Sequence, residues 1–266
     1  MKVLIALLIA TFLLSSCNQN NDKKSNTITN EYPQNIKILL QQIKQKPDSV
    51  GLRLLLINAF DSINNYHDAI MQMDTLIIKD SLNYGLWYRK AKLEEGNKDT
   101  TSAIECYYKA INVYPSPDAL LSVANLLAEK RNAKALNFCK QVEDMRMGRE
   151  YDAHTNFIKG IFNARIGNKV LAEQYFNECI KNDYTYMVAY LEKGFIYYDA
   201  QKFNDALKIF AQAAEINNLY ADAYYWQAKC YEALNDKSNA VLNYKNAVAL
   251  DKSLKEAQQA IERLQH

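Results

Sequence analysis

The chain has 266 residues, of which 49% are hydrophobic and 23% charged, a balance typical of globular proteins. Its 32 basic and 30 acidic residues leave a net charge of +2, so no basic surface for nucleic acid is expected. Only seven Gly and four Pro occur, which disfavours glycine-rich phosphate loops and turn-dense β folds.

Residues 1–16 read MKVLIALLIATFLLSS and predict a signal peptide. Lys2 supplies the positive charge in front of an apolar run from Val3 to Leu14. A helix needs about 20 apolar residues to span a bilayer, and this run is shorter.

The signal peptide ends in Leu14-Ser15-Ser16-Cys17, which resembles the bacterial lipobox. The resemblance implies that Cys17 is acylated, becomes the new N-terminus and anchors a lipoprotein, since several acyl chains anchor stably. An ordinary secretory signal that ends near a cysteine is the alternative. Asn18 stands where enterobacterial lipoproteins carry a retention Asp, so analogy favours the outer membrane, facing the periplasm.

Residues 17–32 follow as a lipidated Cys and a polar linker. The stretch from Asn18 to Glu31 contains one apolar residue, Ile28, and cannot bury itself in a core. We expect a flexible tether with a reach of roughly 20 Å.

A helical array is expected to begin at residue 33. Between Pro33 and Lys46, apolar residues recur at helical spacing, and Pro47 follows the end. The apolar stripe consists of Ile36, Leu39, Leu40 and Ile43. This helix looks like a lone second helix, a half-repeat over 33–49.

Residues 187–254 hold one pattern twice, 34 residues apart. Small and aromatic residues share the offsets: Gly194 and Ala228, Tyr197 and Tyr231, Ala206 and Ala240, Phe210 and Tyr244, Ala213 and Ala247. We number each unit from 1 to 34, with Met187 as position 1 of its unit. Positions 4, 8 and 11 then lie on one face of the first helix, and positions 20, 24 and 27 lie on one face of the second. Each unit is therefore predicted to be a helical hairpin that buries its apolar face by stacking on its neighbours.

This period and these offsets resemble the tetratricopeptide repeat, whose pattern is Trp-x-x-Leu-Gly-x-x-Tyr, then Ala, an aromatic residue, Ala and Pro. The resemblance implies an all-α fold, an α-α superhelix or solenoid of about six hairpins plus terminal capping helices, over residues 33–266. The repeats are expected at about 50–83, 84–117, 117–152, 153–186, 187–220 and 221–254, with a polar cap helix at 254–265.

Two places depart from the pattern. In the third repeat, the turn from Glu129 to Asn132 must be shortened, and the charged tail from Asp144 to Tyr151 predicts a changed pitch or a hinge. In the second repeat, Glu94 replaces the expected core residue at position 11, and we interpret Glu94 and Glu95 as a solvated face.

The sequence contains no catalytic or metal-binding motif. Apart from Cys17, its cysteines are Cys106, Cys139, Cys179 and Cys230, without a CxxC spacing. We expect buried thiols that act as small hydrophobic residues, with a strained Cys106–Cys139 disulfide as the alternative. His67, His154 and His266 have no partner at ligand spacing. We therefore predict no cofactor, no metal and no enzymatic activity.

In the tetratricopeptide family, first helices line a concave groove through positions 2, 5, 9 and 12. The resemblance implies a protein-binding groove formed by Tyr88, Lys92, Asn125, Phe157, Ile161, Leu191, Phe195, Tyr198, Tyr225 and Lys229. Its C-terminal half is apolar and aromatic, and its N-terminal half is polar. The alternative is that these side chains pack between neighbouring first helices and bind nothing.

The carboxylate clamp of cytosolic family members uses Lys and Asn at positions 5 and 9. Only asparagines match here, so extended apolar segments or helices are the expected ligands.

The resemblance implies a membrane-tethered scaffold or adaptor that binds protein or peptide partners in the cell envelope. No motif selects among outer-membrane, secretion or pilus, and peptidoglycan-enzyme assembly. The alternative is a structural homo-oligomer whose groove is filled by a second copy.

Overall fold

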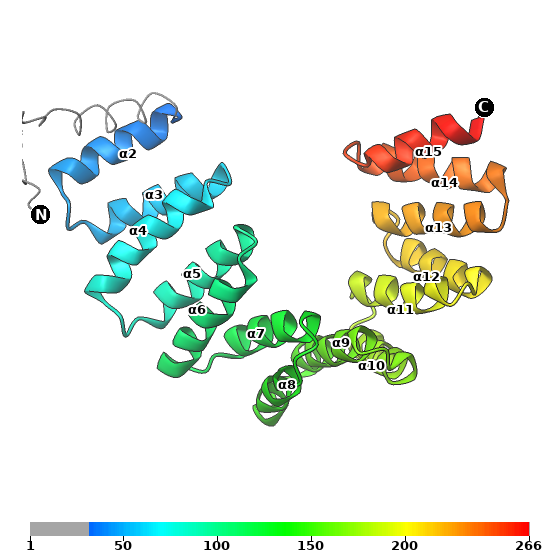
Figure 1. The fold of residues 1–266 in the computed structure, drawn as a ribbon, viewed down its shortest axis with the longest axis horizontal. Helices are drawn as coiled ribbons and strands as arrows, with labels where there is room; N and C mark the ends of the chain where they lie inside the picture. The colour runs from blue at the N-terminus through cyan, green and yellow to red at the C-terminus, as the bar shows by residue number, and fades with distance from the viewer. Residues whose placement is uncertain (1–31, 266) are drawn as a thin grey trace, which may run out of the picture. The chain divides into compact units, whose positions relative to one another are not determined.

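A computed structural model of the chain describes residues 32–265. The predicted signal peptide, Cys17 and nearly all of the polar linker lie outside these residues. The described part contains 14 α-helices and no strand, which confirms the all-α prediction (Figure 1). Between residues 32 and 265, no helix combines the length and apolar character needed to cross a bilayer. The chain divides into two compact units that meet within one helix, at Gln72 and Met73.

The first unit contains α2 (Gln34–Gln45), α3 (Val50–Ser62) and the first half of α4 (Tyr66–Lys79). The ring of Tyr32 packs edge-on against Phe60, with centroids 5.4 Å apart, and its hydroxyl donates to Asp68 Oδ2 at 2.5 Å. The Arg53 guanidinium donates to Gln72 Oε1 at 2.5 Å. These contacts join the start of the described chain and α3 to α4.

In the second unit, consecutive helices pair as hairpins, and each hairpin packs on the next (Figure 1). The pairs are α5 (Tyr84–Gly96) with α6 (Thr100–Val113), α7 (Pro117–Glu129) with α8 (Lys134–Asp144), α9 (Arg149–Arg165) with α10 (Lys169–Asn182), α11 (Met187–Asp199) with α12 (Phe203–Ile216), and α13 (Ala221–Ala233) with α14 (Lys237–Leu250). The final helix, α15 (Lys255–Gln265), packs on α14.

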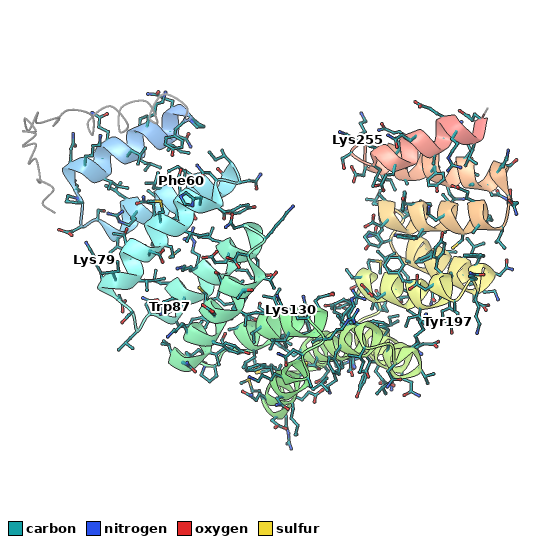
Figure 2. The ribbon with its side chains drawn as sticks, viewed as in Figure 1. Phe60, Lys79, Trp87, Lys130, Tyr197 and Lys255 are labelled. Carbon is teal, nitrogen blue, oxygen red and sulfur yellow. The ribbon has the colours of Figure 1, made fainter. Side chains whose placement is uncertain are left out.

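Small residues at position 8 allow a ring from the second helix to approach the first. A Cβ atom on Gly160 would lie 2.4 Å from a ring carbon of Phe176, and one on Gly194 would lie 2.2 Å from a ring carbon of Phe210. Both rings are fully buried, and side chains fill the space between paired helices (Figure 2). The hydrophobic contact between helices thus depends on the absence of a side chain at this position.

Every interhelix turn of the hairpins has the same backbone. The residue at position 15 adopts a positive φ, between 57° and 85°, in all six hairpins: Asn64, Lys98, Arg131, Gly167, Gln201 and Asn235. The next residue donates its N–H to a carbonyl five residues back, as Asp99 does to Glu94 at 3.0 Å. This hydrogen bond closes the end of the first helix, as in a Schellman motif.

The junction between Asp144 and Tyr151, where the sequence predicts a changed pitch or a hinge, is packed against neighbouring helices. Helix α8 ends at Asp144, and α9 begins at Arg149 and runs for 17 residues, against 13 in α5, α7, α11 and α13. Helix α9 contacts both α7 and α8. One apolar cluster includes buried residues from Ala91 to Ala189 and therefore runs through the junction.

The Glu94–Glu95 pair is not the solvated face that the sequence suggested. Glu94 is 7% exposed, and burial raises the pKa of its carboxyl, against the charge of Lys90. Lys90 itself donates to Asp74 Oδ1 at 2.6 Å. Glu95 is half-buried and accepts a hydrogen bond from the Tyr107 hydroxyl. Packing of α5 against its neighbours thus buries Glu94, while Glu95 stays partly exposed and hydrogen-bonded.

The cysteines of the helical array are buried and free, which confirms their interpretation as small core residues. Burial raises the pKa of the Cys106 thiol to about 11 and those of Cys139, Cys179 and Cys230 to about 12. The alternative disulfide between Cys106 and Cys139 is not formed. Within residues 32–265, no three His, Cys, Asp or Glu side chains are placed to hold a metal ion.

Candidate protein-interaction site

Three predicted groove residues belong to the core. Phe157, Ile161 and Leu191 are 9%, 1% and 7% exposed, so the prediction that they line an open groove is wrong. Phe157 packs against the ring of Tyr186, with centroids 5.0 Å apart, and Ile161 joins the apolar cluster that reaches Ala189. Second helices help to cover them: Phe157 contacts Phe176 of α10, and Leu191 clusters with Phe210 of α12.

Phe195 and Tyr198 are half-buried in an aromatic cluster around Trp226. Their ring centroids lie 4.6 and 5.5 Å from that of Trp226, in edge-on contacts. Phe195 also contacts Phe210, and Tyr198 contacts Phe203. These rings therefore join α11, α12 and α13 and do not form the open apolar patch expected from the sequence. Packing between neighbouring first helices, the alternative interpretation, describes them better.

Tyr225 and Lys229 line a shallow pocket of about 500 Å³ that also includes residues of α15. The Tyr225 hydroxyl donates to Glu256 Oε2 at 3.3 Å. Two other lining residues, Tyr244 and Arg263, donate to Glu232, at 3.0 Å from the hydroxyl and 2.8 Å from the guanidinium. The polar groups of this pocket are thus engaged within the protein.

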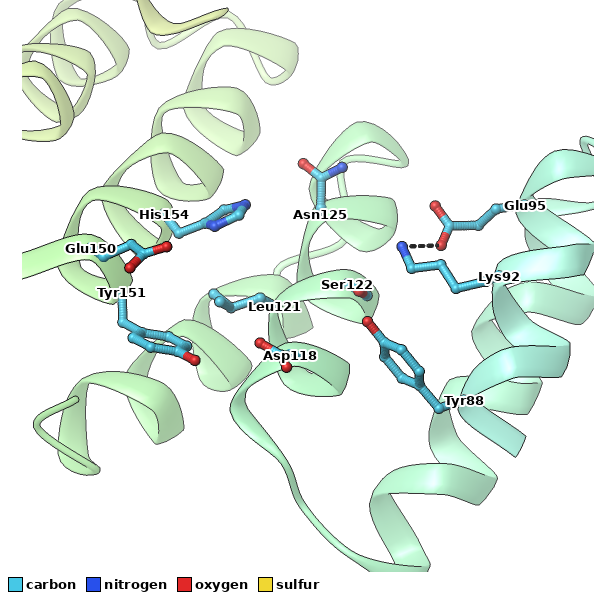
Figure 3. Close-up of a pocket in the computed structure, with 10 residues that line it drawn as sticks. All are labelled: Tyr88, Lys92, Glu95, Asp118, Leu121, Ser122, Asn125, Glu150, Tyr151 and His154. Carbon is cyan, nitrogen blue, oxygen red and sulfur yellow. Dashed lines mark hydrogen bonds and ion pairs between the residues drawn. The ribbon is translucent and has the colours of Figure 1, made fainter. Parts of the chain in front are cut away.

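The remaining predicted groove residues, Tyr88, Lys92 and Asn125, come together in one pocket of about 370 Å³ (Figure 3). It lies on first helices α5, α7 and α9. The other lining residues are Glu95, Asp118, Leu121, Ser122, Glu150, Tyr151 and His154. This pocket is the candidate interaction site, and we call it the α5–α7–α9 pocket.

The α5 wall carries a satisfied ion pair. Lys92 donates to Glu95 Oε1 at 2.9 Å, one helical turn away (Figure 3), and the Tyr107 hydroxyl donates to the same carboxylate. The Tyr88 ring stacks on Tyr84, with centroids 5.7 Å apart, and lies edge-on to Tyr107 at the same distance. This wall is therefore held in place by aromatic packing and has no free charge.

The α7 and α9 walls carry carboxylates. Ser116 caps α7 by accepting a hydrogen bond from the Ala119 N–H, which places Asp118 in the first turn. The extra turn at the start of α9 brings Glu150 and Tyr151 to the pocket. The charge of Asp118 and a hydrogen bond to it raise the pKa of the Tyr151 hydroxyl.

His154 lies one turn further along α9, with its ring edge-on to Tyr186 at 5.5 Å. Desolvation lowers the pKa of this imidazole, and it outweighs the opposing charges of Glu150 and Asp118. The residue is nonetheless exposed at the surface of the pocket. The lowered pKa favours the neutral imidazole.

Asn125 carries a buried polar atom without a partner. Its Oδ1 atom is buried and accepts no hydrogen bond from the residues that the structure describes. Buried polar atoms are almost always paired in folded proteins, so a missing donor calls for an explanation.

Several residues of this pocket were not among the predicted groove residues. Asp118 and His154 occupy position 2 of their repeats, and Glu95 occupies position 12. Positions 2 and 12 line the groove in the family, so the repeat pattern could have identified all three. Glu150 and Tyr151 precede position 1 of the fourth repeat. They reach the pocket only because α9 starts four residues early, at Arg149, which no residue of the repeat pattern signals.

Comparisons with known proteins agree with this architecture. Residues 84–117 and 191–263 match two models of the tetratricopeptide repeat. A tetratricopeptide repeat protein from Parabacteroides merdae has a similar structure, with a TM-score of 0.71 and 16% identity over 87% of this chain and 91% of that one. No curated protein matches the sequence.

Two further solved structures share the fold. PilW, a type IV pilus biogenesis factor, has a TM-score of 0.63 and 20% identity over 79% of this chain and 97% of its own. The pilF protein of Pseudomonas aeruginosa has a TM-score of 0.56 and 15% identity, over 78% and 94%. Identities this low show a common fold and nothing more.

Proposed function

We propose that this array of tetratricopeptide repeats is a scaffold that binds partner proteins through the α5–α7–α9 pocket. The observation that carries the proposal is the set of polar and aromatic side chains that three successive first helices bring to one concave site (Figure 3). Aromatic residues in concave sites frequently dominate the binding energy of protein interfaces. Asp118 and Glu150 are exposed and retain acceptor atoms for a partner's polar groups.

We further propose that the scaffold is anchored to the cell envelope through Cys17, at the outer membrane and facing the periplasm. The Leu14-Ser15-Ser16-Cys17 junction supports this placement. Partners would then belong to an envelope process, with outer-membrane, secretion or pilus, and peptidoglycan-enzyme assembly as candidates. The fold shared with PilW, a type IV pilus biogenesis factor, is compatible with the second of these.

A capture experiment from detergent-solubilised membranes tests the binding proposal. Changing Tyr88→Ala together with Tyr151→Ala removes both rings from the pocket and should abolish specific capture. The control, Tyr184→Ala, removes an exposed ring outside the pocket and should retain it. Equal capture by both variants would rule out the pocket. If the captured protein is a second copy of this chain, confirmed as a dimer by sedimentation, self-association becomes the function.

The anchoring proposal has its own test. Replacing Cys17→Ala should prevent incorporation of a labelled fatty acid and leave an uncleaved precursor or a product released from membranes. Labelling and fractionation of wild-type and variant cells measure this. A variant that still carries the label would disprove the lipobox assignment.

A further inference from the structure

We propose that the α5–α7–α9 pocket recognises a basic side chain, Lys or Arg, in an extended segment of the partner protein. This inference rests on the proposed function and adds the chemistry of the ligand.

The charge of the pocket is the first argument. Three carboxylates, on Glu95, Asp118 and Glu150, face one ammonium, on Lys92, which leaves a net charge of −2. Lys92 is already paired with Glu95. Glu150 makes no hydrogen bond or ion pair with any residue between 32 and 265, and Asp118 is approached by the Tyr151 hydroxyl and by no cation. The uncompensated charge thus lies on the α7 and α9 walls and favours a cationic ligand.

Hydrogen-bonding capacity points the same way. The groups that a ligand can reach are acceptors: Glu150 is exposed and has no partner within residues 32–265, and the exposed carboxylate of Asp118 keeps acceptor sites beyond the one used by Tyr151. A ligand that satisfies them must donate. An ammonium donates three hydrogen bonds and a guanidinium five, whereas a carboxylate donates none and would meet the repulsion of the negative walls. The pocket is therefore the electrostatic opposite of a clamp for a chain's terminal carboxylate.

The apolar atoms of the pocket suit a long basic side chain. Tyr88 and Tyr151 stand on opposite walls, with Leu121 between them (Figure 3). Aromatic faces attract ammonium and guanidinium groups, and an apolar floor accommodates the methylene stem. A contact between an ammonium group and an aromatic ring already occurs beside the α5 wall, where Lys92 Nζ lies 5.7 Å from the centroid of the Tyr107 ring.

Selection from a library of random displayed peptides tests the inference on the full chain. Peptides enriched on the wild-type protein should share a Lys or Arg at one position. A selected peptide, made synthetically, should bind the Asp118→Asn, Glu150→Gln double variant at least tenfold more weakly. Replacing its arginine by citrulline, which has the same shape without the charge, should weaken binding to the wild type by a similar factor.

The control variant, Glu105→Gln with Glu215→Gln, removes two exposed carboxylates outside the pocket and should bind like the wild type. Circular dichroism checks that the variants fold, and Glu150→Gln alone serves if the double variant does not. Enriched peptides without a shared basic residue would overturn this inference and leave the proposed function standing. A selection that enriches no peptide would count against both.

Discussion

At the scale of single residues, the size of the residue at position 8 of a repeat is matched to the aromatic residue that packs against it from position 24. Glycine at position 8 faces phenylalanine in two hairpins, as with Gly194 and Phe210, and alanine accompanies tyrosine in two others, as with Ala228 and Tyr244. The tyrosine hydroxyl donates to a glutamate at position 12, for example Glu232, and phenylalanine has no such bond to make. The phenylalanine ring instead lies directly over the glycine.

This matching predicts the effect of adding one methyl group. Gly194→Ala would place a Cβ atom 2.2 Å from Phe210, so the ring must move, at a cost of about 1–3 kcal/mol. Thermal unfolding should therefore occur at a lower temperature. The control is Gly51→Ala in α3, where no atom lies within 4 Å of the new Cβ and helix propensity should raise stability slightly. A melting temperature unchanged by Gly194→Ala would contradict this packing.

The burial of Glu94 predicts that its contribution to the free energy of unfolding depends on pH. Burial raises the pKa of its carboxyl above the ordinary value of 4.5, so the folded state prefers the protonated form. The stability linked to this preference is present below pH 4.5 and is lost as the pH rises through the folded pKa. Glu94→Gln, which is neutral at every pH, should therefore stabilise the protein at pH 7 and have little effect near pH 4.

Urea unfolding at the two pH values measures the difference. The control is Glu105→Gln on the neighbouring helix α6, an exposed site where no such dependence is expected. An equal effect of Glu94→Gln at both pH values would mean that the carboxyl is not buried in solution.

At the scale of elements, each of the six interhelix turns has a residue in the left-handed conformation at position 15. The residue types found there differ in how readily they adopt this conformation. Only Gly167 is a glycine at this position, whereas Lys98, Arg131 and Gln201 hold long side chains at φ between 58° and 62°. A left-handed conformation costs an ordinary residue about 1–2 kcal/mol. Tertiary packing of the paired helices therefore imposes the turn on residues that disfavour it.

A reciprocal pair of substitutions tests this view. Gly167→Ala should lower stability by about 1–2 kcal/mol, because φ is +85° there and no favourable contact offsets the strain. Gln201→Gly should raise stability, by less than about 1 kcal/mol, since glycine also gains entropy in the unfolded chain. Chemical denaturation of both variants measures the two free energies. Shifts of the same sign would show that the turn does not control the effect.

Helix α9 shows how one element changes the site. Its early start supplies Glu150 and Tyr151 to the pocket, and its last turn holds Arg165, which donates to Glu129 of α7 at 2.8 Å and to Glu192 of α11 at 3.0 Å. The same helix thus builds the pocket at one end and joins two neighbouring hairpins at the other.

At the scale of the whole array, the buried thiols report on how the helices open. Cys106, Cys139, Cys179 and Cys230 lie in different hairpins, and their raised pKa values keep them protonated at pH 8. A thiol reagent should therefore leave all four unmodified in the native protein and modify them in denaturant. Mass spectrometry after brief exposure reads each site separately. Rapid labelling of one cysteine without denaturant would identify a hairpin that opens locally.

The sequence by itself determined the helices and their pairing, because a 34-residue period of small and aromatic residues at helical spacing leaves few other ways to bury the apolar faces. It also identified the core glycines and alanines, and three residues of the pocket, Tyr88, Lys92 and Asn125.

Only the tertiary structure decided which groove positions remain open. Ile161 and Lys92 both occupy position 9, but Ile161 is buried and Lys92 is exposed. The exposure of this position depends on how closely neighbouring first helices pack. The 34-residue period carries no information on that distance. The tertiary structure also raised the pocket's negative charge from −1 to −2, because Glu150 reaches the pocket through an extra helical turn outside the repeat. Repetition specifies contacts within a hairpin and between equivalent neighbours, whereas a binding site arises where the repeats differ.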